Sequence, residues 1–140
     1  MMDGSDINPY SGLHSMMPQV EQVEEGTLWH AGEPLKEGEE RATGEDIVVA
    51  LRTVYDPEIP VNIFDIGLIY DLLQSDNGDI EVVMTLTSPN CPVAGILPQQ
   101  VADAVGAVSG VGEAMVRLTW SPVWTMDMMS EDAKMALGML

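Results

Sequence analysis

Hydrophobic and polar positions change their spacing along the chain, and this spacing predicts its elements from about residue 43 onward. Apolar residues recur at helical spacing from Ile47, just after a capping-box pattern that starts at Thr43, and predict a helix over about 44–54. Asp56-Pro57 ends this helix, because a residue before proline avoids the helical region.

Two later segments predict a β-hairpin. Residues 66–73 and 80–87 are rich in apolar and β-branched side chains, which are typical of strands. The Asn77-Gly78 pair between them is a strong signal for a tight antiparallel turn. Alternation of apolar and polar residues over 112–120 predicts a third strand.

A long apolar face over 93–108 predicts the helix that connects the second and third strands. Pro98 falls inside this face and predicts a kink or a restart, because proline cannot donate to the helix hydrogen bonds. A crossover through a helix usually joins parallel neighbours in a sheet, so we expect these two strands to be parallel.

A short last helix completes the pattern, with Ser130 as its N-cap and with Met135 and Leu137 expected to face the core. The order helix, strand, strand, helix, strand, helix predicts an α/β (α+β) fold. We expect a small two-layer sandwich over residues 43–140, in which helices cover one face of a three-stranded mixed sheet.

Residues 1–42 differ from this domain. Glycine, proline, serine and acidic residues dominate there and the apolar residues show no period, which predicts an acidic, flexible N-terminal extension. The stretch from Gly26 to His30 is locally apolar and is suited to pack on the domain as an arm. His14 and His30 are lone rings in a polar segment and are not expected to bind metal.

Composition narrows the classes of partner. Acidic residues outnumber basic ones by 23 to 5, and the resulting net charge of -18 argues against nucleic acid and anionic membranes as partners. No apolar run approaches the ~20 residues of a membrane-spanning helix, and the N-terminus lacks the pattern of a signal peptide. A single cysteine cannot form an internal disulfide, so we expect a cytoplasmic protein.

The only cysteine is the main candidate for chemistry. Cys91 follows a strand and a turn, and Pro92 after it is typical of the first position of a helix. A thiol at a helix N-cap meets unpaired N–H groups and the positive end of the helix dipole, which favour the thiolate. We therefore interpret Cys91 as a candidate nucleophile or soft-metal ligand.

Two carboxylates lie on the loop after the first predicted helix. Asp56 and Glu58 are two positions apart, and Pro57 and Pro60 stiffen the chain around them. From composition alone, a solvated connection is the simpler interpretation of this loop. Asp65 lies between apolar residues further on, where a capping or turn-holding carboxylate is expected.

Several motifs together resemble one known family. They are DPEIPVN at 56–62, DIGLIY at 65–70, MTLTSPNCPV at 84–93, WSPVWT at 120–125 and MSEDAKMALG at 129–138. Residues 43–140 thus resemble the small metal–sulfur cluster assembly domain, which occurs in SufT-like proteins, in PaaD and in cytosolic iron–sulfur targeting proteins. The resemblance implies a non-enzymatic accessory factor of the SUF pathway. Its partners would be components of that machinery and the client proteins that receive iron or clusters.

The resemblance also implies a surface cleft. Its residues are Asp56, Glu58, Ile59, Thr87, Ser88 and Cys91. Cys91 would ligate iron or an iron–sulfur cluster transiently, with Asp56 and Glu58 as additional oxygen ligands. Clusters commonly take four thiolates and one chain provides one. Ligation therefore requires a second chain, as in a homodimer, or a small thiol or a partner protein.

Two alternatives to a carrier remain open on the residues themselves. A thiol-dependent enzyme would use Cys91 as nucleophile, with Thr87 or Ser88 as donor to an oxyanion, but the core offers no histidine as base. A protein-interaction adaptor would instead hold Cys91 as a buried structural thiol, since buried free cysteines are common.

Overall fold

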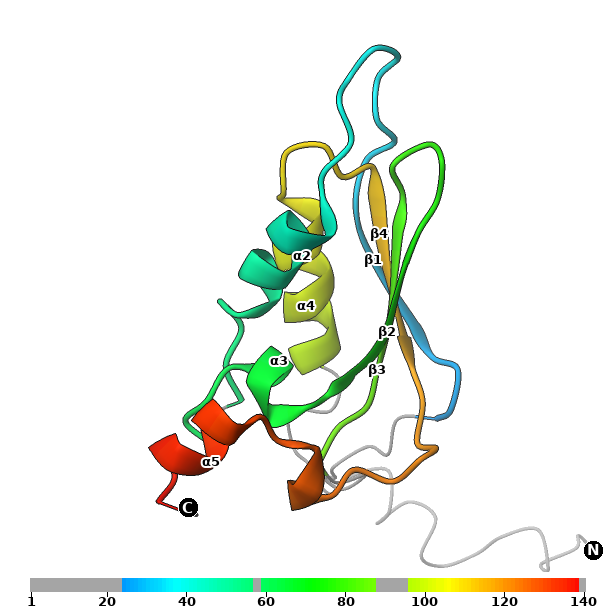
Figure 1. The fold of residues 1–140 in the computed structure, drawn as a ribbon. Coiled ribbons are helices and arrows are strands. Elements are labelled where there is room, and N and C mark those ends of the chain that lie inside the picture. The colour runs from blue at the N-terminus through cyan, green and yellow to red at the C-terminus, as the bar shows by residue number, and fades with distance from the viewer. Residues whose placement is uncertain (1–23, 57–58, 88–95, 139–140) are drawn as a thin grey trace, which may run out of the picture.

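A computed structural model describes residues 24–56, 59–87 and 96–138. In chain order the elements are β1 (Leu28–Gly32), α2 (Gly44–Leu51), α3 (Ile63–Ile66), β2 (Ile69–Gln74), β3 (Ile80–Met84), α4 (Leu97–Gly106), β4 (Glu113–Leu118), the 3₁₀ helix η2 (Met126–Met128) and α5 (Glu131–Ala136). They form two layers. All the labelled helices lie on one side of the sheet, as Figure 1 shows, and the predicted two-layer α/β class is confirmed.

The sheet has the strand order β1-β4-β3-β2. The hairpin of β2 and β3 is antiparallel, and β3 and β4 are parallel, as predicted. The prediction of three strands is wrong, because β1 adds a fourth strand antiparallel to β4. Trp29 and Ala31 of β1 pack against the core, whereas Leu28 is exposed. The alternation of apolar and polar residues in β1 is weak, so the sequence of this segment does not predict a strand without knowledge of its pairing with β4.

This strand also corrects part of the predicted flexible extension. Residues 28–32 belong to the sheet, and Ala42 is buried, with its N–H donating to the carbonyl of Gly110 at 2.9 Å. The chain from β1 to α2 is therefore part of the folded domain. Residues 1–23 lie outside the described residues, and for them a flexible extension remains a prediction.

The predicted start of α2 is confirmed. The backbone N–H of Asp46 donates to the Thr43 hydroxyl at 3.2 Å, and the N–H of Thr43 donates to the Asp46 carboxylate at 3.1 Å. Ile47 and Leu51 bury the inner face of this helix. The helix ends at Leu51, earlier than predicted, although Val54 is still buried.

The segment before β2 forms a helical turn instead of the start of a strand. The Asn62 side chain accepts a hydrogen bond from Asp65 N–H at 2.9 Å and caps α3. Gly67 ends this helix with φ +91°, a conformation that L side chains rarely adopt. The strand predicted from residue 66 therefore begins at Ile69.

The helices after β3 test two further predictions. Pro98 lies in the first turn of α4, where a missing N–H costs no hydrogen bond; of the two predicted outcomes, the described helix shows a start at this proline and no kink. The predicted start of this helix near residue 93 lies outside the described residues. Ser130 caps α5 as predicted, but Met135 is 64% exposed and Ala133 is buried instead. Leu137 does pack against the core.

Candidate functional site

Three of the six predicted cleft residues lie among the described residues. Asp56 and Ile59 belong to the loop between α2 and α3, and Thr87 follows the end of β3. Figure 1 shows that this loop and the end of β3 lie in the half of the molecule that holds α3 and α5, away from the β2–β3 turn. Glu58, Ser88 and Cys91 lie outside the described residues, as does the helix N-cap predicted for Cys91.

The loop that carries Asp56 is held by hydrogen bonds. Asp56 is only 3% exposed, and its Oδ1 accepts from the backbone N–H of Ile59 at 3.1 Å. The N–H of Val61 donates to the Ile59 carbonyl at 2.6 Å, and that of Ile63 donates to Val54 at 2.8 Å. Asp56 therefore acts as a turn-holding carboxylate, whatever further role it has.

Asp65 joins the loop to neighbouring helices and confirms the predicted turn-holding role. Its carboxylate accepts from the Asn62 side-chain amide at 2.8 Å and lies 3.7 Å from the guanidinium of Arg52 at the end of α2. Arg52 also stacks over the ring of Phe64 at 5.1 Å. The backbone carbonyl of Asp65 accepts from Ser130 N–H at 2.8 Å, which fixes the start of α5.

Two aromatic residues, which the sequence motifs contain but to which they assign no role, hold the segment after β4 against β2 and α3. The Tyr70 hydroxyl donates to the Pro122 carbonyl at 2.7 Å, with the Met128 sulfur 3.4 Å away. Trp124 Nε1 donates to the Ile66 carbonyl at 2.9 Å. A break in the β2–β3 register between Ile69 and Asp71 aims Tyr70 at this contact. No signal in the local sequence marks these long-range bonds.

Thr85 is a buried polar residue beside Tyr70. Burial raises the pKa of Tyr70 above its ordinary value, and a side-chain contact with Thr85 acts in the opposite direction. That contact does not have the geometry of a hydrogen bond, and the Thr85 hydroxyl therefore has no hydrogen-bond partner among the described residues. The phenolic proton of Tyr70 is directed at the Pro122 carbonyl, so the Thr85 hydroxyl receives no hydrogen bond from Tyr70. A threonine inside the buried run after β3 is the sequence signal for this site.

The missing hydrogen bond of Thr85 predicts that an isosteric substitution there has the opposite effect on stability from the same substitution at a threonine whose hydroxyl is hydrogen-bonded. Thr85→Val is expected to leave the free energy of unfolding unchanged or to raise it by about 1 kcal/mol, because it removes an unsatisfied buried hydroxyl. Thr119→Val is the matched control. Its hydroxyl accepts from Ser121 N–H at 3.2 Å and donates to the Ser121 carbonyl at 3.1 Å, so we expect a loss of about 1–2 kcal/mol. Urea unfolding measures both, and equal losses would contradict the assignment at Thr85.

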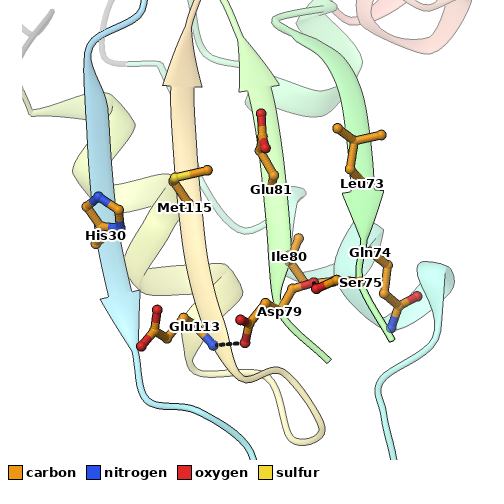
Figure 2. Close-up of a pocket in the computed structure, with 9 residues that line it drawn as sticks. All are labelled: His30, Leu73, Gln74, Ser75, Asp79, Ile80, Glu81, Glu113 and Met115. Atoms are coloured by element: carbon orange, nitrogen blue, oxygen red, sulfur yellow. Dashed lines mark hydrogen bonds between the residues drawn. The ribbon is translucent and has the colours of Figure 1, made fainter. Parts of the chain in front are cut away.

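The described residues contain no preformed metal centre. Across 24–56, 59–87 and 96–138, no three His, Cys, Asp or Glu side chains converge in a way that could hold an ion. Within the same part of the chain no helix is long and apolar enough to cross a membrane. Among the described residues the histidine is His30. Its side chain extends from β1 on the side of the sheet that faces away from the helices, as Figure 2 shows.

The fold defines a small two-layer α/β domain. Its candidate site is built from the hydrogen-bonded loop between α2 and α3 and from the end of the central strand β3. The chain belongs to the iron–sulfur cluster assembly protein family, whose model matches residues 44–116. The match includes both segments of the predicted cleft, and the family resemblance drawn from the sequence motifs is confirmed.

Individual relatives agree with this assignment. A protein of Porphyromonas gingivalis named Fe-S protein maturation auxiliary factor is 52% identical over 98 residues, which cover 70% of this chain and 93% of the relative. Fe-S protein maturation auxiliary factor SufT of Staphylococcus aureus is 41% identical over 85 residues, covering 61% of this chain and 97% of that protein. The crystal structure of a domain of unknown function, DUF59, from Bacillus anthracis is similar with a TM-score of 0.65 and 36% identity. It covers 69% of this chain and 92% of that chain.

Proposed function

We propose that this protein is an accessory factor in the maturation of iron–sulfur proteins, and that it carries iron or a cluster transiently to client proteins through Cys91. The observation that carries the proposal is the family match over residues 44–116, which spans Asp56, Thr87 and Cys91. The names of relatives at 41% and 52% identity, both maturation auxiliary factors, support the accessory role.

In this proposal the metal or cluster is cargo. Cys91 supplies one thiolate, and the remaining ligands come from the SUF machinery, from a client or from a second copy of the chain. Shared ligation of this kind is labile, which suits transfer better than storage. The hydrogen bond from Ile59 N–H to Asp56 holds the turn of this loop, in which Asp56 would be one oxygen ligand of the cargo.

The described geometry favours a carrier over a thiol enzyme. A nucleophilic cysteine needs an adjacent base, and His30 is the histidine that the described residues offer. It lies midway along β1 beside Met115, on the sheet face shown in Figure 2, whereas Thr87 follows the end of β3. We therefore propose a non-enzymatic role. A cytoplasmic location is proposed separately, because a chain with one cysteine forms no internal disulfide.

Replacing the thiol tests the proposal. After anaerobic reconstitution with iron and sulfide, Cys91→Ser is expected to bind at least about tenfold less iron than the wild type, because a ligand is lost. In cells lacking the native protein, the same variant is expected to leave client enzymes without their clusters. Met135→Ser removes another sulfur at an exposed helix position and serves as the control. Equal iron content and equal client activity for Cys91→Ser and wild type would overturn the role of the thiol.

A further inference from the structure

The sheet has a face that none of the described helices covers (Figure 1). We call it the open face. Strand alternation and register place on it Leu28 and His30 of β1, Glu113, Met115 and Arg117 of β4, Glu81 and Val83 of β3, and Asp71 and Leu73 of β2. The intervening residues, such as Val82 and Val116, are fully buried under the helices. The open face is therefore a second surface, built from residues outside the predicted cleft.

A hollow lies across the middle of the open face. His30, Met115, Glu81 and Leu73 stand in one row across the four strands, and Figure 2 shows their side chains on the same side. The hollow has a volume of about 290 Å³, and Asp79 and Glu113 lie at its end near the hairpin turn. Leu73 is 46% exposed beside it. A space of this size admits a few side chains and is at the lower limit for a small-molecule pocket.

Charge on the open face is unbalanced. Four carboxylates, those of Asp71, Asp79, Glu81 and Glu113, border the hollow or lie on the same face. The guanidinium on this face belongs to Arg117 and is already paired with Glu81 at 2.9 Å. Asp79 accepts from the backbone N–H of Glu113 at 2.8 Å, which holds its carboxylate in place. The face thus offers fixed negative charge around exposed apolar groups.

A second copy of the chain does not fit this surface. Two such faces would bring like charges together, and desolvated like charges oppose association. A metal ion does not fit either, because no three ligand side chains converge among the described residues.

We propose that the open face binds a short segment of a partner protein that presents lysine or arginine side chains next to apolar ones. The basic side chains pair with Glu113 and Asp79, and the apolar ones enter the hollow against Leu73 and Met115. Methionine adapts its shape easily, which suits a surface that accepts more than one sequence. The proposal does not depend on the proposed function, because none of these residues belongs to the predicted cleft.

The test uses a fluorescent peptide of alternating lysine and leucine, with a glutamate–leucine peptide of the same length as its counterpart. We expect the lysine peptide to bind the full chain and the glutamate peptide not to bind. In NMR spectra of the protein, the shifted signals should be those of Leu73, Glu81, Met115 and His30. Shifts centred on the acidic loop 33–42 would instead indicate unspecific attraction and would overturn the proposal.

Two matched pairs of variants separate a built site from net charge. Glu113→Lys is compared with Glu131→Lys, which makes the same charge change on α5, on the helical side of the molecule. Leu73→Ser is compared with Val49→Ser, since Val49 is 64% exposed on α2. The open-face variants are expected to raise the Kd of the lysine peptide about fivefold or more, which corresponds to roughly 1 kcal/mol, and the controls less than about twofold. Equal effects within each pair would overturn the proposal, and circular dichroism verifies that every variant is folded.

Discussion

Replacing Gly67 with alanine is expected to lower the free energy of unfolding by about 3 kcal/mol, a large share of the ~5–15 kcal/mol typical of a domain. Two costs add. Gly67 has φ +91°, and an alanine in that conformation costs about 1–2 kcal/mol. A Cβ on Gly67 would also collide with the backbone carbonyl of Met128, and relieving such overlap costs about 1–3 kcal/mol more.

The collision affects more than one contact. To make room, the segment around Met128 must move away from the end of α3, where Trp124 donates to Ile66 and Ser130 to Asp65. Gly38→Ala is the matched control, because Gly38 has φ +88° and nothing within 4 Å of the added Cβ. It should lose only the conformational cost of an alanine at positive φ, about 1–2 kcal/mol. If urea unfolding gave equal losses for both variants, the close packing of Gly67 against Met128 would be contradicted.

The second large effect is expected at Asp56, where two substitutions should behave differently. Asp56→Ala removes the acceptor for Ile59 N–H at a position that is 3% exposed, and we expect a loss of about 1–3 kcal/mol together with reduced client maturation. Asp56→Asn keeps an oxygen acceptor of the same shape. It is expected to stay within about 1 kcal/mol of the wild type and to retain client maturation, because the turn is preserved.

The pair distinguishes a turn-holding role from metal ligation. Asp127→Asn, which removes a carboxylate in η2, serves as the control for loss of charge. Urea unfolding and client-enzyme activity in cells are measured on the same variants. A stable Asp56→Asn protein that fails in maturation would show that the carboxylate itself ligates cargo, and the turn-holding account would then be insufficient.

Local signals in the sequence were sufficient for much of the fold. The capping box at Thr43 and the alternation of β4 were recognised because they depend on neighbours within a few residues. Five motifs together indicated the family, and each could be recognised because its residues are contiguous. The position of Asp65 between apolar residues also indicated the turn-holding role of its carboxylate correctly.

Other features could not be read from the sequence. The phase of α5 buries Ala133 rather than Met135, because packing against the domain decides which side of a short helix faces inward. Tyr70 bonds to Pro122, 52 positions away along the chain, and no local pattern encodes such a pair. The unsatisfied hydroxyl of Thr85 likewise depends on where its neighbours direct their own hydrogen bonds.

The sequence alone determined the class of domain, the family and the cysteine on which the proposed chemistry rests, because these follow from short-range spacing and contiguous motifs. Tertiary structure alone decided that Leu28–Gly32 completes the sheet and that carboxylates from three strands share the face that the described helices leave open. The physical reason is that strand pairing and burial are set by partners distant in the chain, whose backbone groups and side chains meet only after folding.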